Sequence, residues 1–361
     1  MTIKPWRATA IQVRSERASQ AADNAAAADI IKRNQDRLIA LIERACASDQ
    51  KPDLVVFPEF AMQGPPLHMK VEEWIERACS SIPGPLTEPL QALAKREGIF
   101  IAGNMFEAPP EWPGRYFNSS FLIDDQGEVI LNYRRVNTAA FPSVHDFMSD
   151  YLAVTDQDQV FPVVDTRLGR LALIPCGEIV IPEVARMMMM QGAEVILHPT
   201  NSKRTDAQEA AKLSRTTENM TYLVSANVAG PIGFSPDNTI PGGRSHILDH
   251  HGNTLAYEDG AEETIAVSAM IDVEQLRTDR RTDTGLSIHC CGRATKCTCL
   301  FIAPPSSIRP TLSATRRWSM WPRPRAISPP LAPILSAPAS SIPYRRAQPS
   351  PWPPLLTRRV Q

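Results

Sequence analysis

Two segments of this chain read LVVFPEF over residues 54–60 and LALIPCGE over residues 171–178. In each segment a short apolar run leads through a proline to a residue that can carry chemistry, Glu59 in the first and Cys176 in the second. Short apolar runs are typical of buried strands, and open α/β sheets place functional residues just beyond the carboxyl ends of such strands. The two segments therefore predict buried strands of an α/β fold and mark Glu59 and Cys176 as candidate functional residues.

The sequence around these segments alternates between strand-like and helical stretches, which is typical of a layered α/β domain. Strands are predicted over residues 8–13, 54–57, 99–107, 118–123, 129–133, 170–175, 194–198, 222–226, 245–249 and 264–271. Helices are predicted over residues 21–48, 85–96, 181–191, 206–220 and 273–281. Neither an internal repeat nor a linker divides residues 1–287, so we expect one domain there.

Length and composition narrow the class of protein. The chain has 361 residues, of which 43% are hydrophobic and 21% charged, enough apolar material for one large α/β domain and too much for disorder throughout. It contains no uninterrupted apolar run of membrane-spanning length, and residues 1–17 lack the pattern of a secretory signal. We therefore expect no membrane partner and a cytoplasmic location.

Charge is divided sharply at about residue 288. Residues 288–361 contain 11 of the 38 Lys and Arg residues and no Asp or Glu, so residues 1–287 hold 27 basic and all 39 acidic residues. A polyanion requires clustered positive charge on its partner. The acidic first part therefore argues against nucleic acid as a partner.

Residues 288–361 form a tail rich in Pro, Arg and Ser, for which three interpretations compete. The first is a disordered basic tail, since residues 301–361 hold 14 of the 33 prolines and show no lasting periodicity. The second is a zinc site on His289 with Cys290, Cys291, Cys297 and Cys299, whose spacing does not match common structural sites. The third, which we favour, is translation in a shifted reading frame, because neighbouring frames compatible with these residues read as balanced helical sequence. Sequencing the gene around codon 288 tests it, and we expect a restored frame to give a stable homo-oligomer.

The residues near the two strand ends suggest acid–base and nucleophilic chemistry. Desolvation at the edge of a core raises the pKa of a carboxylate such as Glu59 and suits it to proton transfer. The small Gly177 leaves its backbone N–H open to a negative oxygen bound beside the sulfur of Cys176. The alternatives are a helix-capping Glu59 and a Cys176 that serves only as a small buried hydrophobe.

The motifs of residues 8–271 together resemble those of the nitrilase superfamily, the carbon–nitrogen hydrolases. They are LVVFPE (54–59), YRRV (133–136), CGE (176–178) followed by IPE (181–183), QGAEVI (191–196), RTTEN (215–219) and AN (226–227). The resemblance implies a four-layer αββα sandwich. It also implies a Glu–Lys–Cys triad, in which the glutamate takes the thiol proton and the sulfur attacks a nitrile or amide carbon, giving a thioimidate or thioester that water releases.

By this resemblance Glu59 matches the general base and Cys176 the nucleophile. The position of the family's lysine holds Arg135, whose planar guanidinium differs in reach and geometry from an ammonium. Gly177, Glu178 and Asp146 are the predicted oxyanion and substrate-binding residues. Many members of the family carry a second glutamate after the lysine motif, and residues 142–147 offer Asp146 and His145 in its place. We expect an active site to hold the Cys176 thiolate at a pKa well below the ordinary thiol value of about 8.5.

The sequence thus predicts a cysteine-dependent hydrolase acting on a small amide, N-carbamoyl compound or nitrile. The alternative is a catalytically impaired member of the family that binds a small metabolite or a partner protein. No phosphate loop or metal-ligand motif occurs in residues 1–287, so no cofactor and no metal are expected.

Several other conspicuous residues have simpler structural explanations. Met187–Met190 are expected to fill the core, and His198 to be a buried histidine. Arg215 and Glu218 are expected to form an ion pair on one helix face, and His250 and His251, which precede Gly252, to be solvated in a turn.

Overall fold

The computed structural model describes residues 2–282, apart from residues 139, 157–158 and 236. These residues belong to the first of two units of the chain, Met1–Pro305. The predicted boundary at residue 288, the tail and the zinc site on His289 and the four cysteines all lie outside the described residues.

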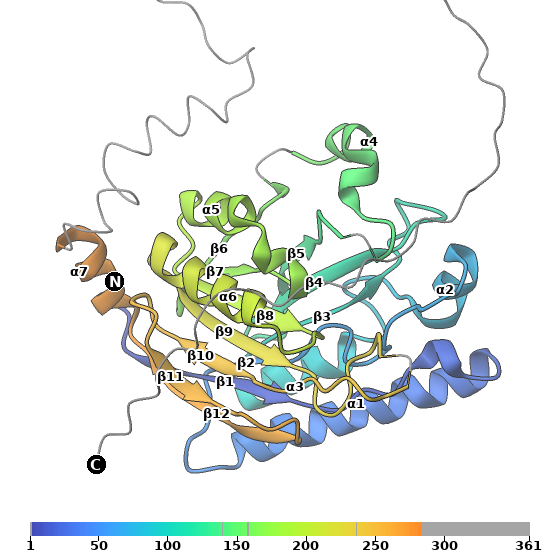
Figure 1. Ribbon diagram of the computed structural model, residues 1–361, viewed down its shortest axis with the longest axis horizontal. Coiled ribbons are helices and arrows are strands. Elements are labelled where there is room, and N and C mark those ends of the chain that lie inside the picture. The colour runs from blue at the N-terminus through green and yellow to red at the C-terminus, as the bar shows by residue number, and fades with distance from the viewer. Residues whose placement is uncertain (1, 139, 157–158, 236, 283–361) are drawn as a thin grey trace, which may run out of the picture. The chain divides into compact units, whose positions relative to one another are not determined.

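Two six-stranded mixed sheets form the centre of the fold (Figure 1). The first contains β1 (Trp6–Gln12), β2 (Leu54–Val56), β3 (Phe100–Glu107), β4 (Phe117–Ile123), β5 (Val129–Arg134) and β12 (Thr264–Ile271). The second contains β6 (Val164–Thr166), β7 (Gly169–Leu173), β8 (Val195–Thr200), β9 (Tyr222–Asn227), β10 (His246–Leu248) and β11 (Thr254–Tyr257). The strand orders are β12-β1-β2-β3-β4-β5 and β11-β10-β9-β8-β7-β6, with β1-β2-β3 and β7-β8-β9 parallel.

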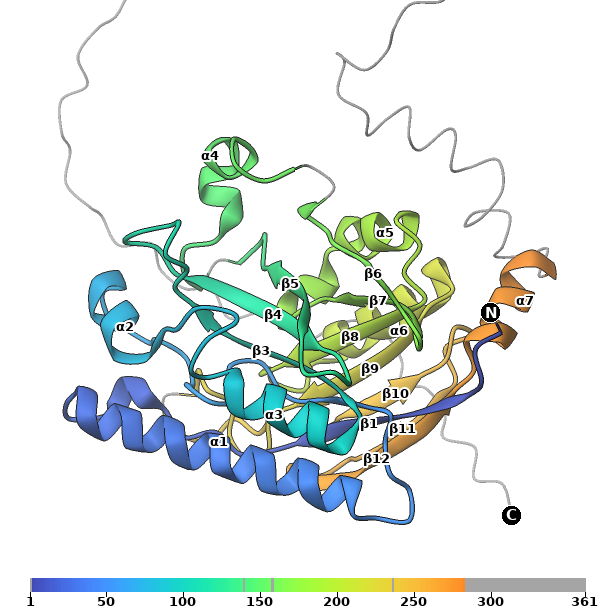
Figure 2. The same cartoon turned by 180° about the vertical axis from the view of Figure 1, so that it is seen from behind.

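Helices cover the outer faces of both sheets. The first sheet is flanked by α1 (Asn24–Cys46) and α3 (Glu88–Glu97), and the second by α5 (Pro182–Met190) and α6 (Asp206–Asn219) (Figures 1 and 2). The other helical segments are α2 (Val71–Ala78), α4 (Met148–Leu152), α7 (Val273–Thr282) and the 3₁₀ turns η1 (Ala18–Gln20), η2 (Val144–Phe147) and η4 (Cys176–Val180). The four-layer αββα sandwich is confirmed. No helix among the described residues is both long enough and apolar enough to cross a bilayer.

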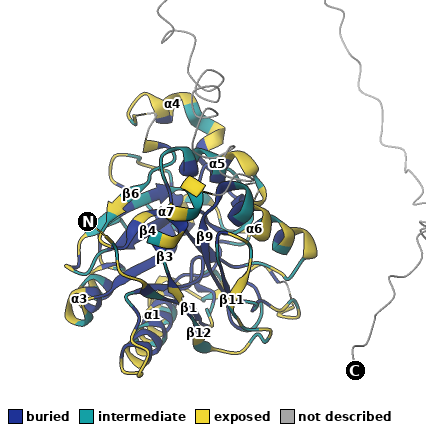
Figure 3. Cartoon of the chain, turned by 90° about the vertical axis from the view of Figure 1, so that its left-hand side faces the viewer, coloured by how far each residue is buried: buried dark blue, intermediate teal, exposed yellow. Residues whose placement is uncertain are grey.

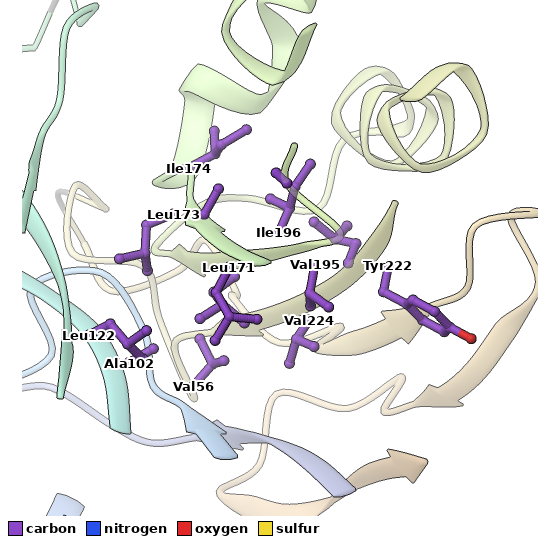
Figure 4. Packing of buried hydrophobic residues seen from close by; sticks show 14 of the residues in the cluster. Val56, Ala102, Leu122, Leu171, Leu173, Ile174, Val195, Ile196, Tyr222 and Val224 are labelled. Atoms are coloured by element: carbon purple, nitrogen blue, oxygen red, sulfur yellow. The ribbon is translucent and has the colours of Figure 1, made fainter. Parts of the chain in front are cut away.

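Side chains of the central strands alternate between two apolar clusters, as the period of a strand requires. On β2, Leu54 and Val56 join the cluster between the sheets, whereas Val55 packs with the residues under α1 and α3. Figure 4 shows Val56 near Leu171 of the opposite sheet. The interior strands are buried and the helices expose their outer surfaces (Figure 3). Because both faces of these strands are buried, their sequences read as continuous apolar runs.

Gly103 on β3 fills a position where no larger residue fits. A Cβ atom there would lie 2.0 Å from Cζ of the buried Phe57 ring. We expect Gly103→Ala to lower the free energy of unfolding by about 1–3 kcal/mol, because the ring must move within a packed core. Urea denaturation measures this change. Phe57→Leu should recover part of the loss in the double variant, and a Gly103→Ala protein as stable as the wild type would contradict the argument.

The structure confirms some of the simpler residue assignments and corrects one. Met188 and His198 are fully buried, and Arg215 forms an ion pair with Glu218. The expectation that His250 is solvated is wrong, since its exposed fraction is only 2%. Helix α7 packs over the turn after β10 and brings Asp279 against this ring, a contact between residues 29 positions apart.

Candidate active site

Glu59 lies where the two sheets meet. It follows β2 by three residues, and its backbone N–H donates to the carbonyl oxygen of Thr200 at the end of β8 over 3.4 Å. The side chain is 1% exposed, and its Oε1 accepts from Nδ2 of Asn118 at 2.8 Å and from Nη1 of Arg135 at 3.0 Å. A charged partner and an amide therefore hold the carboxylate in a single orientation.

Arg135 follows β5 directly and crosses toward the Glu59 carboxylate. Its backbone N–H donates to Asn118 at 2.8 Å and its Nε donates to the carbonyl oxygen of Asn137 at 2.9 Å, so both ends of the residue are held. Burial disfavours the charge of this guanidinium, but the carboxylates of Glu59 and Glu178 favour it, and the pKa of Arg135 is raised. Arg135 therefore remains a cation in the site.

Cys176 begins the turn η4, three residues after β7 ends. Its φ of 43° lies in the left-handed region, which is costly for a residue with a side chain and is concentrated at functional sites. The backbone of Asn201, the Thr200 side chain and Glu59 lie close enough to the sulfur to shift the pKa of the thiol or of the carboxyl. The nucleophile and base predicted from the sequence are therefore in contact, although 117 positions separate them.

The thiol and carboxyl of this pair both resist ionisation. Burial first, and the Glu59 charge second, raise the pKa of Cys176 to about 11, while Arg135 opposes that rise. Burial likewise raises the pKa of Glu59, against the lowering effects of Arg135 and Asn118. The expectation of a Cys176 pKa well below the ordinary thiol value is therefore wrong for the free site. Two anions cannot share this buried space, so at least one of the two groups keeps its proton near neutral pH.

Glu178 does not have the surroundings of a substrate-binding residue. It is fully buried, and its Oε1 accepts from the backbone N–H groups of Val136 at 3.1 Å and Asn137 at 2.9 Å. Its Oε2 accepts from the Tyr133 hydroxyl at 2.7 Å. These bonds tie η4 to the backbone that carries Arg135, so the structure supports a positioning role for Glu178 in place of the predicted substrate contact.

Asp146 lies in η2 and is half-exposed. Its carboxylate accepts from the Ser143 backbone N–H at 2.9 Å in a capping box and lies 3.2 Å from Nε2 of His145. A pocket of about 360 Å³ opens beside it, lined by Arg135, Asn137, Thr138, His145, Gly177 and Ile181. Gly177 and Arg135 line this pocket together with His145 from η2, whereas Asp146 is not among its lining residues.

Sequence reasoning missed the polar groups that orient the pair. Asn118 is far from Glu59 in the sequence and lies on β4, which pairs with β3. Thr200 is the last residue of β8, the strand beside β7, and Asn201 follows it. The one available signal was that Thr200 and Asn201 follow an apolar strand, as Cys176 does. Because β7 and β8 are parallel neighbours, the residues that follow them lie close together at the same edge of the sheet.

Lys212 is a second buried cation near Cys176 that the sequence analysis did not select. It lies on α6 with only 1% of its side chain exposed, and its Nζ donates to Glu209 at 2.9 Å. Burial lowers the pKa of Lys212, and the interactions with Glu209 and, to a smaller extent, with Cys176 oppose that shift. The helix that packs on η4 therefore presents a charged residue on its buried face, where an apolar one is the rule.

Comparison with known proteins identifies the family of the chain. The family model for carbon–nitrogen hydrolases matches residues 7–281. Formamidases from Bacillus cereus (strain Q1) and Bacillus anthracis (strain A0248) are 28% identical to this chain over 207 residues, which is 56% of the chain and 58% of each relative. The match therefore spans little more than half the length of these curated relatives.

Solved structures with the same fold are more distant in sequence. Nit3 from Saccharomyces cerevisiae, a member of branch 10 of the nitrilase superfamily, matches with a TM-score of 0.61 at 18% identity, covering 79% of this chain and 96% of Nit3. An amidase from Nesterenkonia sp. matches with a TM-score of 0.56 at 21% identity, covering 80% and 97%. At these identities the likeness concerns the fold alone. With the family model matching three quarters of the sequence, the chain belongs to the carbon–nitrogen hydrolase family.

Proposed function

We propose that this protein hydrolyses the C–N bond of a small amide through a covalent thioester on Cys176. The observation that carries the proposal is the convergence of Glu59, Arg135 and Cys176 in one buried site, with Glu59 hydrogen-bonded to Arg135 and interacting with the thiol of Cys176. A base, a cation and a nucleophile in contact are what acyl transfer to a thiol requires.

The reaction follows from where the proton of the pair lies. Glu59 takes the proton from the thiol as the sulfur attacks the carbonyl carbon, so the thiolate forms only when an electrophile is present. The backbone N–H of Gly177 and the Arg135 guanidinium stabilise the oxyanion. The protonated Glu59 then gives its proton to the leaving amine, the C–N bond breaks, and a thioester remains. Glu59 next deprotonates a water that attacks the thioester, which releases the acid and restores the thiol.

A small amide is the substrate class best supported by the relatives. Two of them are named as formamidases, and the Nesterenkonia amidase has been described with the acetamide moiety of fluoroacetamide added covalently at its active-site cysteine. We expect formamide and short aliphatic amides to release ammonia faster than N-carbamoyl amino acids or nitriles. A screen of ammonia release over these three classes tests the order, and activity confined to nitriles would overturn it.

The alternative is a binding protein that kept the fold, and Arg135 in the lysine position favours it. The two functions differ in turnover. A binding protein would show a saturable change in thermal stability with amides and no ammonia release, whereas the proposed hydrolase shows both.

Arg135 should contribute to the oxyanion through its charge. We expect Arg135→Ala to lower kcat by about 10²-fold, because the variant loses one donor to the oxyanion. The variant also leaves Glu59 without its ion pair. Arg135→Lys should preserve or raise kcat, since the lysine ammonium can reach the carboxylate of Glu59. Steady-state ammonia release measures both variants.

Arg134→Lys is the matched control for the Arg135 variants. Arg134 is the preceding residue and pairs with Glu107 at 2.9 Å, away from the cysteine. Its substitution should leave kcat unchanged. If the lysine and alanine variants at position 135 were equally slow, the side chain would have no specific part in the reaction.

A further inference from the structure

A cluster of three potential metal ligands lies outside the site described above, between the turn after β10 and helix α7. Its members are His250, His251 and Asp279, and one ligand atom of each lies within 4.8 Å of the others. We propose that these residues bind a divalent transition-metal ion of the zinc class, which would fasten α7 to the second sheet.

The ligand atoms lie near the separations of a tetrahedral site, and His250 has to move away from Asp279 by about half an ångström to reach them. Oδ2 of Asp279 lies 2.7 Å from Nε2 of His250 and 3.2 Å from Nε2 of His251. Atoms bound about 2.0–2.1 Å from a tetrahedral zinc ion lie about 3.3 Å from one another. The half-exposed His251 can adjust and leaves a path for the ion and for a water as fourth ligand.

Neighbouring residues hold the ligands in place. Gln275 Nε2 donates to Oδ1 of Asp279 at 2.8 Å, which fixes the carboxylate and leaves Oδ2 directed at the two rings. Asp249 accepts from the backbone N–H groups of His251 at 2.9 Å and Asn253 at 2.8 Å, which fixes the turn. Orientation of ligands by such outer hydrogen bonds is characteristic of metal sites.

The proton balance sets the strength of the site. An ionised carboxylate only accepts hydrogen bonds, so in the metal-free site Nε2 of each ring carries a proton that the metal must displace to Nδ1. Nδ1 of His251 is on a half-exposed ring, but Nδ1 of His250 is buried and has no partner among the described residues. The resulting unpaired N–H weakens binding, and we expect a dissociation constant on the order of 1 μM.

Titration of the full chain with Zn²⁺ by calorimetry tests the proposal. The four tail cysteines are replaced by serine, so that zinc on those thiols does not contribute. We expect one ion per chain and a Tm raised by about 3 °C when zinc is at ten times its dissociation constant. His251→Ala should weaken binding by at least about 10-fold, and so should Asp279→Asn.

His68→Ala is the matched control, because His68 is an exposed histidine that does not belong to this cluster. It should bind zinc like the parent. Equal binding by the His251→Ala and parent proteins would show adventitious zinc at another site and overturn the proposal, as would the absence of one-to-one binding at 100 times the expected dissociation constant. Because His251 is half-exposed, we expect its alanine variant to fold. An unchanged Tm without zinc would show that a loss of binding is due to the missing ligand and not to unfolding.

Discussion

Cys176→Ala is expected to lower kcat for amide hydrolysis by at least about 10⁴-fold, the scale of losing a covalent nucleophile. The sulfur is the atom held against Glu59, Thr200 and Asn201, and the alanine variant leaves no group there to form a thioester. Single-turnover mass spectrometry should show an acyl adduct on the wild-type chain and none on the variant. Ammonia release gives kcat.

Cys79→Ala is the control for this prediction. Cys79 is a free cysteine that closes α2, and burial raises its pKa. Its substitution should leave turnover and the adduct intact. The Cys176→Ala chain should also unfold at a temperature close to that of the wild type. If it retained measurable turnover while folded, the nucleophile would have to lie elsewhere.

Glu59→Gln is expected to separate two effects that usually change together. Turnover should fall by about 10²- to 10⁴-fold, because glutamine cannot accept the thiol proton. The pKa of Cys176 should nevertheless fall, since the Glu59 charge that raises it is removed and Arg135 remains. Ammonia release measures the first effect, and the pH dependence of iodoacetamide alkylation measures the second.

Glu107→Gln is a closely matched control for Glu59→Gln. Glu107 is buried as deeply and pairs with Arg134 as Glu59 pairs with Arg135, but it lies on β3 away from the thiol. We expect its substitution to cost stability without changing the Cys176 titration. A Glu59→Gln protein with wild-type turnover would remove Glu59 from the mechanism.

Glu59 and Cys176 also set the pH dependence of kcat/KM in the wild-type protein. The pKa of Glu59 is raised by burial, and the carboxylate is the form that accepts a proton. As the pH falls through that raised pKa, the base becomes protonated, so kcat/KM should decline at a pH above the ordinary glutamate range. This acid limb should be absent in the residual activity of Glu59→Gln, whereas an identical limb in both proteins would assign it to another group.

Much of the fold could be predicted because its signals are local. The runs at 54–57 and 171–174 are buried and contain β2 and the end of β7. Helix α1 begins at Asn24 because Asp23 accepts from the Ala26 backbone N–H at 2.8 Å. The missed elements, α2, α4, β6 and β11, are short. Strands such as β6 expose part of their residues, so neither an apolar run nor a strict period marks them.

The site could be predicted only in part. Glu59 and Cys176 were found because each follows the end of a strand by three residues, and Arg135 because it occupies a recognisable motif. The role of Glu178 depends on Tyr133 and the backbone after β5, more than forty positions away. A hydrophobic pattern along the sequence carries no information about contacts between residues so far apart.

The sequence by itself determined the α/β class, the family and the residue types at the ends of β2 and β7. These properties depend on each residue and its near neighbours, whose backbone preferences and burial patterns are written along the chain. Only the tertiary structure decided that Cys176 lies beside Glu59, that Lys212 lies buried on α6, and that His250 meets Asp279. Those outcomes depend on how two sheets and their helices pack, because packing sets both the distances between remote groups and the water that each one loses.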